Sequence, residues 1–221
     1  MEISRSAFYK DFKLKWSSGQ HVTIIGTTGD GKTVLAEHLY AMRTYVVIIA
    51  TKSKDDSLDA YDKSYHRITK WPPRFDQKKI IFWQKPGALG DFSEQQHKIK
   101  VVLRDIYKRG GYTVGLDDVA YITGTLKLEP EIRMLATQAR SQDISLVMNI
   151  QRPYRVPLEV TNQSSHILIF GLKDERDVDR VAEASGLDKY TVREAVKGLN
   201  KYDFAWLRIG RDPVIVRNRE D

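Results

Sequence analysis

The sequence predicts an α/β fold in which helices cover both faces of a mostly parallel β-sheet, with a β-hairpin at the C-terminal end. The first observation is a series of six short runs rich in β-branched residues, each typical of a buried strand. These runs are residues 21–26, 45–51, 79–83, 112–116, 144–150 and 166–172. The second is that helix-like stretches separate most of them. Alternation of this kind favours parallel strands joined by crossover helices.

Four stretches between the runs have helical patterns. Residues 32–43 follow the first run, 94–109 precede the fourth, 130–141 precede the fifth, and 174–186 follow the sixth. In the last of these, Asp174 is a suitable N-cap and Gly186 a suitable C-terminal stop.

Two segments depart from the alternation. Residues 52–78 carry dense charge and a Pro-Pro pair, so we expect an excursion with little core of its own. Residues 203–217 predict the hairpin, with its turn at 210–213. No repeat, low-complexity tract or linker divides the chain, and 221 residues suit one core, so we expect a single domain over residues 1–221.

Composition excludes several classes of protein. The chain has no cysteine, which rules out disulfides and thiolate metal sites and favours an intracellular compartment. No apolar run reaches the roughly 18 residues that a membrane span needs, and residues 1–16 lack the apolar core of a signal peptide, so we expect no membrane insertion. The formal net charge of +7 suits contact with nucleic acid or another anionic surface, although a basic domain without such a partner can carry the same charge.

The strongest motif is GTTGDGKT, residues 26–33, which follows the first strand directly and opens the first helix. It fits the phosphate-binding pattern G-x-x-x-x-G-K-[ST] in the strand, loop and helix context that the pattern requires. Glycines let the loop turn its N–H groups toward phosphate oxygens at the positive end of the helix. Lys32 would supply charge to the β and γ phosphates, and the Thr33 hydroxyl would bind Mg²⁺. The motif therefore predicts an ATP site with Mg²⁺, formed by Gly26, Thr27, Thr28, Gly29, Asp30, Gly31, Lys32 and Thr33.

Asp30 is unusual at its position, because a carboxylate beside a triphosphate repels it. We expect this side chain to point to solvent or to a partner subunit, where it either tunes affinity or tips the loop outward.

A pair of carboxylates ends the fourth strand. Asp117 is expected to support the metal through water, and Asp118 to polarise the attacking water as the catalytic acid-base group. The ends of strands next to a phosphate-binding loop are where ligands bind in open α/β sheets. The alternative is that the pair caps a turn.

Gln151 closes the fifth strand, and Asn149 lies on the same face by the two-residue period of a strand. Either could sense the γ phosphate or orient water, and Gln151 lies nearer the strand end. The alternative for each is a hydrogen bond to loop backbone.

The string ARSQDISLVMNIQRP, residues 139–153, together with GTTGDGKT, resembles the FtsK/HerA superfamily of ring-forming DNA-pumping ATPases. The family has an arginine near the end of the helix before this strand, a glutamine closing the strand, and Arg-Pro after it. The similarity runs in order through residues 21–217, and residues 164–177 resemble the next strand and helix entry. The chain departs from the family at Asp30, where small residues are usual, and at Asp118, where glutamate is usual.

The resemblance implies roles for two residues. Arg140 would be the arginine finger that completes a neighbouring subunit's site, and Gln151 the polar sensor. The alternative for Arg140 is a solvated salt bridge, and Arg133 and Arg152 are rival fingers.

The resemblance also implies a function. We expect an ATP-driven translocase of double-stranded DNA that works as a homo-oligomeric ring, a pentamer or a hexamer. The chain has no room for the membrane segments, winged helix or barrel of larger members, so it is most similar to compact viral genome-packaging ATPases. Such motors act at a portal or capsid vertex, in the host cytoplasm or associated with the virion.

Other functions stay open. A plasmid or conjugative DNA-transfer ATPase of the same superfamily is one alternative. A small-molecule kinase or a GTPase-like switch is another, although the sequence has neither an arginine-rich lid nor an N-K-x-D segment. Residues 52–54, 85–90 and 123–127 are candidate DNA contacts, or ordinary solvated loops.

Overall fold

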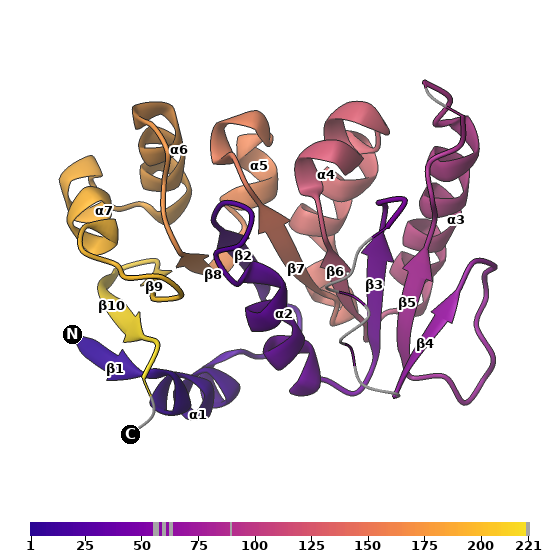
Figure 1. The fold of residues 1–221 in the computed structure, drawn as a ribbon. Coiled ribbons are helices and arrows are strands. Elements are labelled where there is room, and N and C mark those ends of the chain that lie inside the picture. Colours follow the sequence, from indigo (N-terminus) through magenta and orange to yellow (C-terminus); the bar gives the residue numbers. More distant parts are fainter. Residues whose placement is uncertain (55–57, 59–60, 62–63, 89, 220–221) are drawn as a thin grey trace.

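A computed structural model describes residues 1–221 except 55–57, 59–60, 62–63, 89 and 220–221. Its described strands form one sheet in the order β1-β10-β9-β8-β2-β7-β6-β3-β5-β4, drawn in Figure 1. The strands are β1 (Glu2–Ser4), β2 (His21–Ile25), β3 (Val46–Ala50), β4 (Tyr65–Ile68), β5 (Lys79–Trp83), β6 (Thr113–Leu116), β7 (Ser145–Ile150), β8 (Ser164–Ile169), β9 (Phe204–Arg208) and β10 (Arg211–Arg217).

The predicted fold class is confirmed. The strands from β8 to β4 pair in parallel along the sheet order, and β9 pairs antiparallel with both β8 and β10. Each of the six predicted strands is present. The C-terminal hairpin is present too, but it turns between Arg208 and Arg211, earlier than the predicted turn at 210–213, because β10 already begins at Arg211. The central strands β2 and β3 are buried at every residue, as expected for strands covered on both faces.

The four predicted helices are also present, with small differences at their ends. They are α2 (Lys32–Ala41), α3 (Ser93–Arg109), α4 (Glu129–Gln138) and α6 (Glu175–Ser185). The side chain of Asp174 caps α6 by accepting from the N–H of Asp177, and Gly186 ends it in the left-handed conformation. Three further helices were not predicted: α1 (Arg5–Lys15), α5 (Leu158–Thr161) and α7 (Lys189–Val196).

The helices bury the sheet from both sides. On one face, α1 and α2 pack on a core that includes Phe8, Phe12 and Leu39, and Phe8 stacks edge to face on Trp206 at 5.2 Å. On the other face, α3, α4, α6 and α7 cover a larger apolar core. Each large apolar side chain buried there contributes roughly 1.5–3 kcal/mol. No helix in the described part of the chain is both long enough and apolar enough to cross a membrane.

The expectation of little core in residues 52–78 is wrong for the part that the structure describes. Leu58 is fully buried against the α2 face, and β4 adds a parallel strand to the edge of the sheet beside β5. The segment escaped prediction because β4 is an edge strand whose side chains are all partly or fully exposed, so it lacks a buried run. Residues 55–57, 59–60 and 62–63 of this segment lie outside the described residues.

A buried histidine ties β2 to its neighbours at the amino-terminal edge of the sheet. His21 Nε2 lies 3.0 Å from the carbonyl of Ala136, and its Nδ1 accepts from the N–H of Leu146 at 3.0 Å. Both contacts are satisfied by the neutral ring, and burial lowers the pKa of His21 to about 4.

This histidine makes stability depend on pH. The folded pKa lies below the usual 6.5, so the unfolded chain takes up a proton that the folded chain does not, and stability falls as pH drops from 6.5 toward 4. The loss from His21 is on the order of 3 kcal/mol. Denaturant unfolding at several pH values should show a shallower loss for His21→Asn, whose amide oxygen can accept from Leu146 without titrating. The exposed His38→Asn serves as control and should keep the wild-type slope; equal slopes for all three proteins would contradict this assignment.

Candidate nucleotide-binding site

Three strand ends meet at one edge of the sheet. β2 pairs with β7 so that Ile25 lies opposite Ile150, and β6 pairs with β7 so that Leu116 lies opposite Met148. Because the strands are parallel, the residues that follow them leave the sheet on the same side. The phosphate-binding loop, the acid pair and Gln151 are thereby brought together.

A cavity of about 500 Å³ lies at this edge. Its lining includes seven residues that the sequence predicted as site residues: Thr28, Gly29, Gly31, Lys32, Thr33, Asp117 and Gln151. It also includes Val34, Lys52, Lys54, Asn149 and Tyr202. Of the other predicted site residues, Gly26, Thr27 and Asp30 lie in the same loop, Asp118 follows Asp117 directly, and Arg140 lies away from the cavity.

The loop has the backbone that its glycines permit. Gly29 and Gly31 have φ of 88° and 99°, a region that residues with side chains rarely adopt. Gly31 immediately precedes α2, so the N–H groups of its first turn lie at the cavity. Lys32 Nζ donates to the carbonyl of Thr27 at 2.7 Å. Burial lowers the pKa of Lys32, and the nearby charges of Asp30 and Asp117 oppose that shift.

Asp30 turns back onto its own loop rather than to solvent. Its Oδ2 accepts from the N–H of Thr27 at 2.5 Å, across the loop. A carboxylate therefore binds a backbone donor at the start of a loop whose donors are expected to face phosphate. This contact closes the loop on itself and places a negative charge beside Lys32.

The acid pair divides. Asp117 is almost fully buried on the cavity wall, and its Oδ2 lies 2.9 Å from Lys52 Nζ. Asp118 does not line the cavity, and its Oδ1 accepts from the N–H of Tyr121 at 3.0 Å. One oxygen of Asp118 therefore caps a turn, as the alternative interpretation expected.

Asn149 lines the cavity with an unsatisfied atom. The residue is only 4% exposed, and its carbonyl oxygen has no hydrogen-bond partner among the described residues. The register of β6 and β7 places it beside Asp117. Thr33, Asp117 and Asn149 therefore present hydroxyl, carboxylate and amide oxygens to one cavity, and hard oxygen donors of this kind suit a hydrated Mg²⁺.

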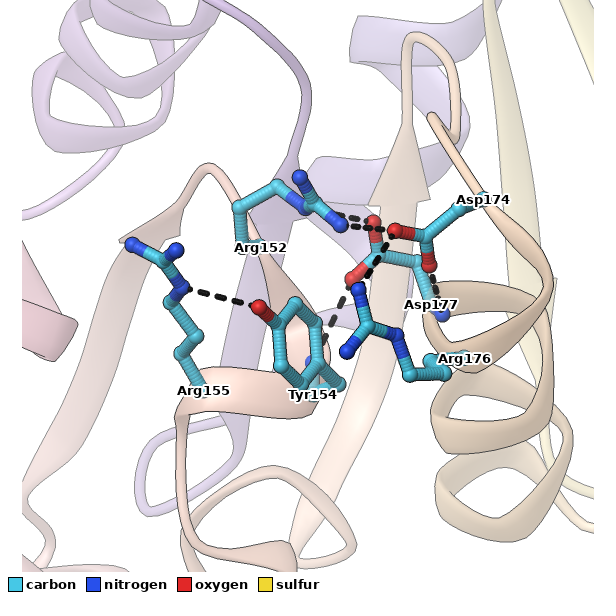
Figure 2. Close-up of polar contacts among 6 residues, drawn as sticks. All are labelled: Arg152, Tyr154, Arg155, Asp174, Arg176 and Asp177. Carbon is cyan, nitrogen blue, oxygen red and sulfur yellow. Dashed lines mark hydrogen bonds and ion pairs between the residues drawn. The ribbon is translucent and has the colours of Figure 1, made fainter.

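The three arginines proposed as fingers differ in their surroundings. Arg133 pairs with Glu129 and Glu159, and Arg152 pairs with Asp174 and Asp177, as Figure 2 shows for Arg152. Arg140 is exposed and has no carboxylate partner in the described part of the chain.

The position of Arg140 separates it from its own cavity. It lies in a short 3-10 turn (Ala139–Gln142) before β7, packed against Gly19 before β2. The loop follows the other end of β2, roughly 17 Å away for a five-residue strand. Arg140 therefore lies at the opposite edge of the sheet from the cavity of its own subunit.

Sequence reasoning missed Tyr202 as a site residue. Its ring lies against the loop, where a Cβ at Gly31 would be 3.3 Å from Cδ1 of the ring. No motif marks Tyr202, and only the return of the chain before β9 brings it to the cavity. Lys52 and Lys54, which the sequence offered as DNA contacts, also line this cavity. Another offered segment, 123–127, overlaps a π-helical turn in which Thr123 is buried.

The inward position of Asp30 leads to a test. Asp30→Asn keeps an acceptor for Thr27 but removes the charge beside the phosphates, so we expect ATP to bind roughly three- to tenfold more tightly. Asp30→Ala is the companion variant, because it removes the charge and the loop contact together. Titration with a fluorescent ATP analogue measures both, and weaker binding by Asp30→Asn would show that the carboxylate supports the site.

Comparisons with known proteins find relatives in sequence and in fold. No family model matches the chain. In sequence, it is 24% identical over 204 residues to a DNA packaging ATPase of Enterobacteria phage PRD1, covering 89% of this chain and 86% of that protein.

Solved structures share the fold. A genome packaging NTPase of Sulfolobus turreted icosahedral virus 2 matches with a TM-score of 0.70 and 16% identity, covering 93% of this chain and 100% of that one. VirB4 of Thermoanaerobacter pseudethanolicus matches with a TM-score of 0.64 and 10% identity, covering 91% and 90%. In sequence and in fold, the chain resembles viral genome-packaging ATPases.

Proposed function

We propose that this protein is a Mg²⁺-dependent ATPase that translocates double-stranded DNA and packages a viral genome. The observation that carries the proposal is the cavity in which Lys32, Thr33, Asp117 and Gln151 meet beside the N-terminus of α2. Similarity to a phage DNA packaging ATPase over nearly the whole chain supports the choice of function.

Seven residues in and beside the cavity have chemical roles in this proposal. Lys32 neutralises charge on the β and γ phosphates, which grows toward the transition state. Thr33 and Asp117 would hold Mg²⁺, which would screen the phosphate charge, and the Asn149 carbonyl oxygen would accept a hydrogen bond from a water bound to it. Gln151 senses the γ phosphate, and Asp118 polarises the attacking water once its capping contact with Tyr121 is released. Tyr202 offers a ring on which the adenine can stack.

The place of Arg140 supports the proposed assembly. A cationic side chain at the edge opposite its own cavity could complete a site in a neighbouring subunit, as expected if residues 1–221 are one motor domain of a homo-oligomeric ring, a pentamer or hexamer. The ring would surround duplex DNA, to which a net charge of +7 gives attraction without sequence preference. It would dock at a portal or capsid vertex, in the host cytoplasm or on the virion.

A conjugative DNA-transfer ATPase is the second candidate. The likeness to VirB4 favours it, but that likeness has 10% identity and a TM-score below that of the viral packaging NTPase. Nothing in the cavity favours a small-molecule kinase or a GTPase-like switch.

Loss of the loop lysine gives a direct test of the ATPase. Lys32→Ala removes the ammonium that the loop holds near Thr27, so Mg²⁺-dependent ATP hydrolysis should fall at least 100-fold. Phosphate release is measured with and without duplex DNA, which should stimulate the wild type but not Lys32→Ala. Lys13→Ala, which removes an exposed lysine of α1 outside the cavity, is the matched control and should retain the activity. Equal turnover in the wild type and Lys32→Ala would refute the proposal.

A mixing experiment tests the shared site. Arg140→Ala and Asp118→Asn should each bind ATP and hydrolyse little, while their mixture should regain turnover, because an Asp118→Asn subunit lends its Arg140 to a neighbour with an intact Asp118. Steady-state ATPase assays on mixtures at several ratios measure this. Arg133→Ala, whose arginine is already ion-paired, is the control and should stay active alone. If the two variants co-assemble and the mixture stays inactive, Arg140 does not complete a neighbouring site and has a structural role instead.

A further inference from the structure

A second cavity adjoins the nucleotide site. It has a volume of about 280 Å³ and is lined by Thr27, Thr28, Gln151, Arg152, Arg155 and Lys173. Thr28 and Gln151 line both cavities, so the two are neighbours across the start of the loop. The lining contains three cations and no carboxylate, together with two hydroxyls and an amide.

One of the cations is held rigidly. Arg152 Nε donates to Asp177 Oδ2 at 2.8 Å, and its Nη2 donates to Asp174 (Figure 2). Asp177 is 1% exposed and also accepts from the N–H of Tyr154 at 3.3 Å. Asp174 is engaged as the N-cap of α6. The guanidinium of Arg152 is therefore fixed before any ligand arrives, which lowers the entropy cost of binding one.

The second cation rests on Tyr154. Arg155 Nε donates to the hydroxyl of Tyr154 at 3.1 Å, and the guanidiniums of Arg152 and Arg176 lie 5.0 and 4.3 Å from the centre of its ring. Figure 2 shows Arg155 at the hydroxyl of Tyr154, with Arg152 and Arg176 beside its ring. The hydrogen bond from Arg155 and the surrounding cations lower the pKa of Tyr154, as expected in a positive environment.

The cluster is not electrically balanced. Four cations, Arg152, Arg155, Lys173 and Arg176, face only two carboxylates, Asp174 and Asp177. Both carboxylates bind Arg152, and Asp174 also binds Arg176 at 3.3 Å. Lys173 has no carboxylate within ion-pair distance among the residues described, and Arg155 has only the tyrosine hydroxyl. Two positive charges at the cavity are left without a counter-charge.

We propose that this cavity is a second phosphate-binding site, which holds one phosphate group beside the loop through Arg152, Arg155 and Lys173. Guanidinium and ammonium groups with nearby hydroxyls are the donors that bind phosphate best in proteins. The phosphate comes either from hydrolysed ATP, as free inorganic phosphate leaving past Gln151, or from the backbone of DNA. The choice of these two sources rests on the proposed function, whereas the phosphate chemistry rests on the cavity alone.

The test uses the full chain and the double variant Arg155→Gln/Lys173→Gln. Both side chains are exposed, so the variant should fold. Lys10→Gln/Lys13→Gln, which removes two exposed cations from α1, is the charge-matched control. Inorganic phosphate is titrated by calorimetry into protein saturated with Mg²⁺ and ADP, so that the loop is occupied. A separate titration measures duplex DNA binding against salt concentration.

Loss of the site should appear in at least one titration. If the source is inorganic phosphate, the double variant binds it at least tenfold more weakly than the control does. If the source is DNA, the slope of log K against log salt falls by about one or two relative to the control. Wild-type affinity and slope in both titrations would overturn the proposal.

The proposed function can fail separately. Titration of inorganic phosphate into Lys32→Ala, with and without the double substitution, reports on the second cavity when the loop is disabled. The wild type could bind phosphate through Arg155 and Lys173 and yet hydrolyse no ATP. That result would refute the proposed ATPase function and leave the proposed phosphate site standing.

Discussion

The parallel pairing of β7 with both β2 and β6 is the constraint on which the site depends. It sets Ile25 opposite Ile150 and Leu116 opposite Met148, so the loop, Asp117 and Gln151 leave the sheet at one edge. The same register buries Asn149 beside Asp117. β7 ends one residue later, at Ile150, and the loop that carries Arg152 and Arg155 begins there. A one-residue shift in the pairing of β7 would turn these side chains to the other face of the sheet, and neither cavity would form.

Much of the fold could be predicted because its signals are local. The buried runs mark the parallel strands, and Asp174 and Gly186 mark the ends of α6. The missing elements lack such signals: β4 has no buried run, and β1 exists only because it pairs with β10 from the far end of the chain. Leu58 could not be predicted as a core residue either. It lies in a charged segment, and it is buried only because the chain folds it against the core beneath α2.

The placement of the candidate site could be predicted where a residue belongs to the phosphate-binding motif or directly follows a predicted strand. Lys32, Thr33, Asp117 and Gln151 meet as expected, because each follows directly from a strand end or a loop. Tyr202 and the clamp of Arg152 by Asp177 could not be predicted, because they join segments distant in sequence. Nor could the direction of Asp30, which depends on a single hydrogen bond to Thr27.

If ATP hydrolysis in this cavity moves the protein along duplex DNA, the protein should displace a third strand bound to that duplex. A labelled oligonucleotide bound as a triplex at one end of a duplex is released when a motor travels through it. We expect release that requires Mg²⁺ and ATP, stops with a non-hydrolysable analogue and is absent in Lys32→Ala. Hydrolysis of ATP by the wild type at a normal rate, with the triplex left in place, would contradict this expectation.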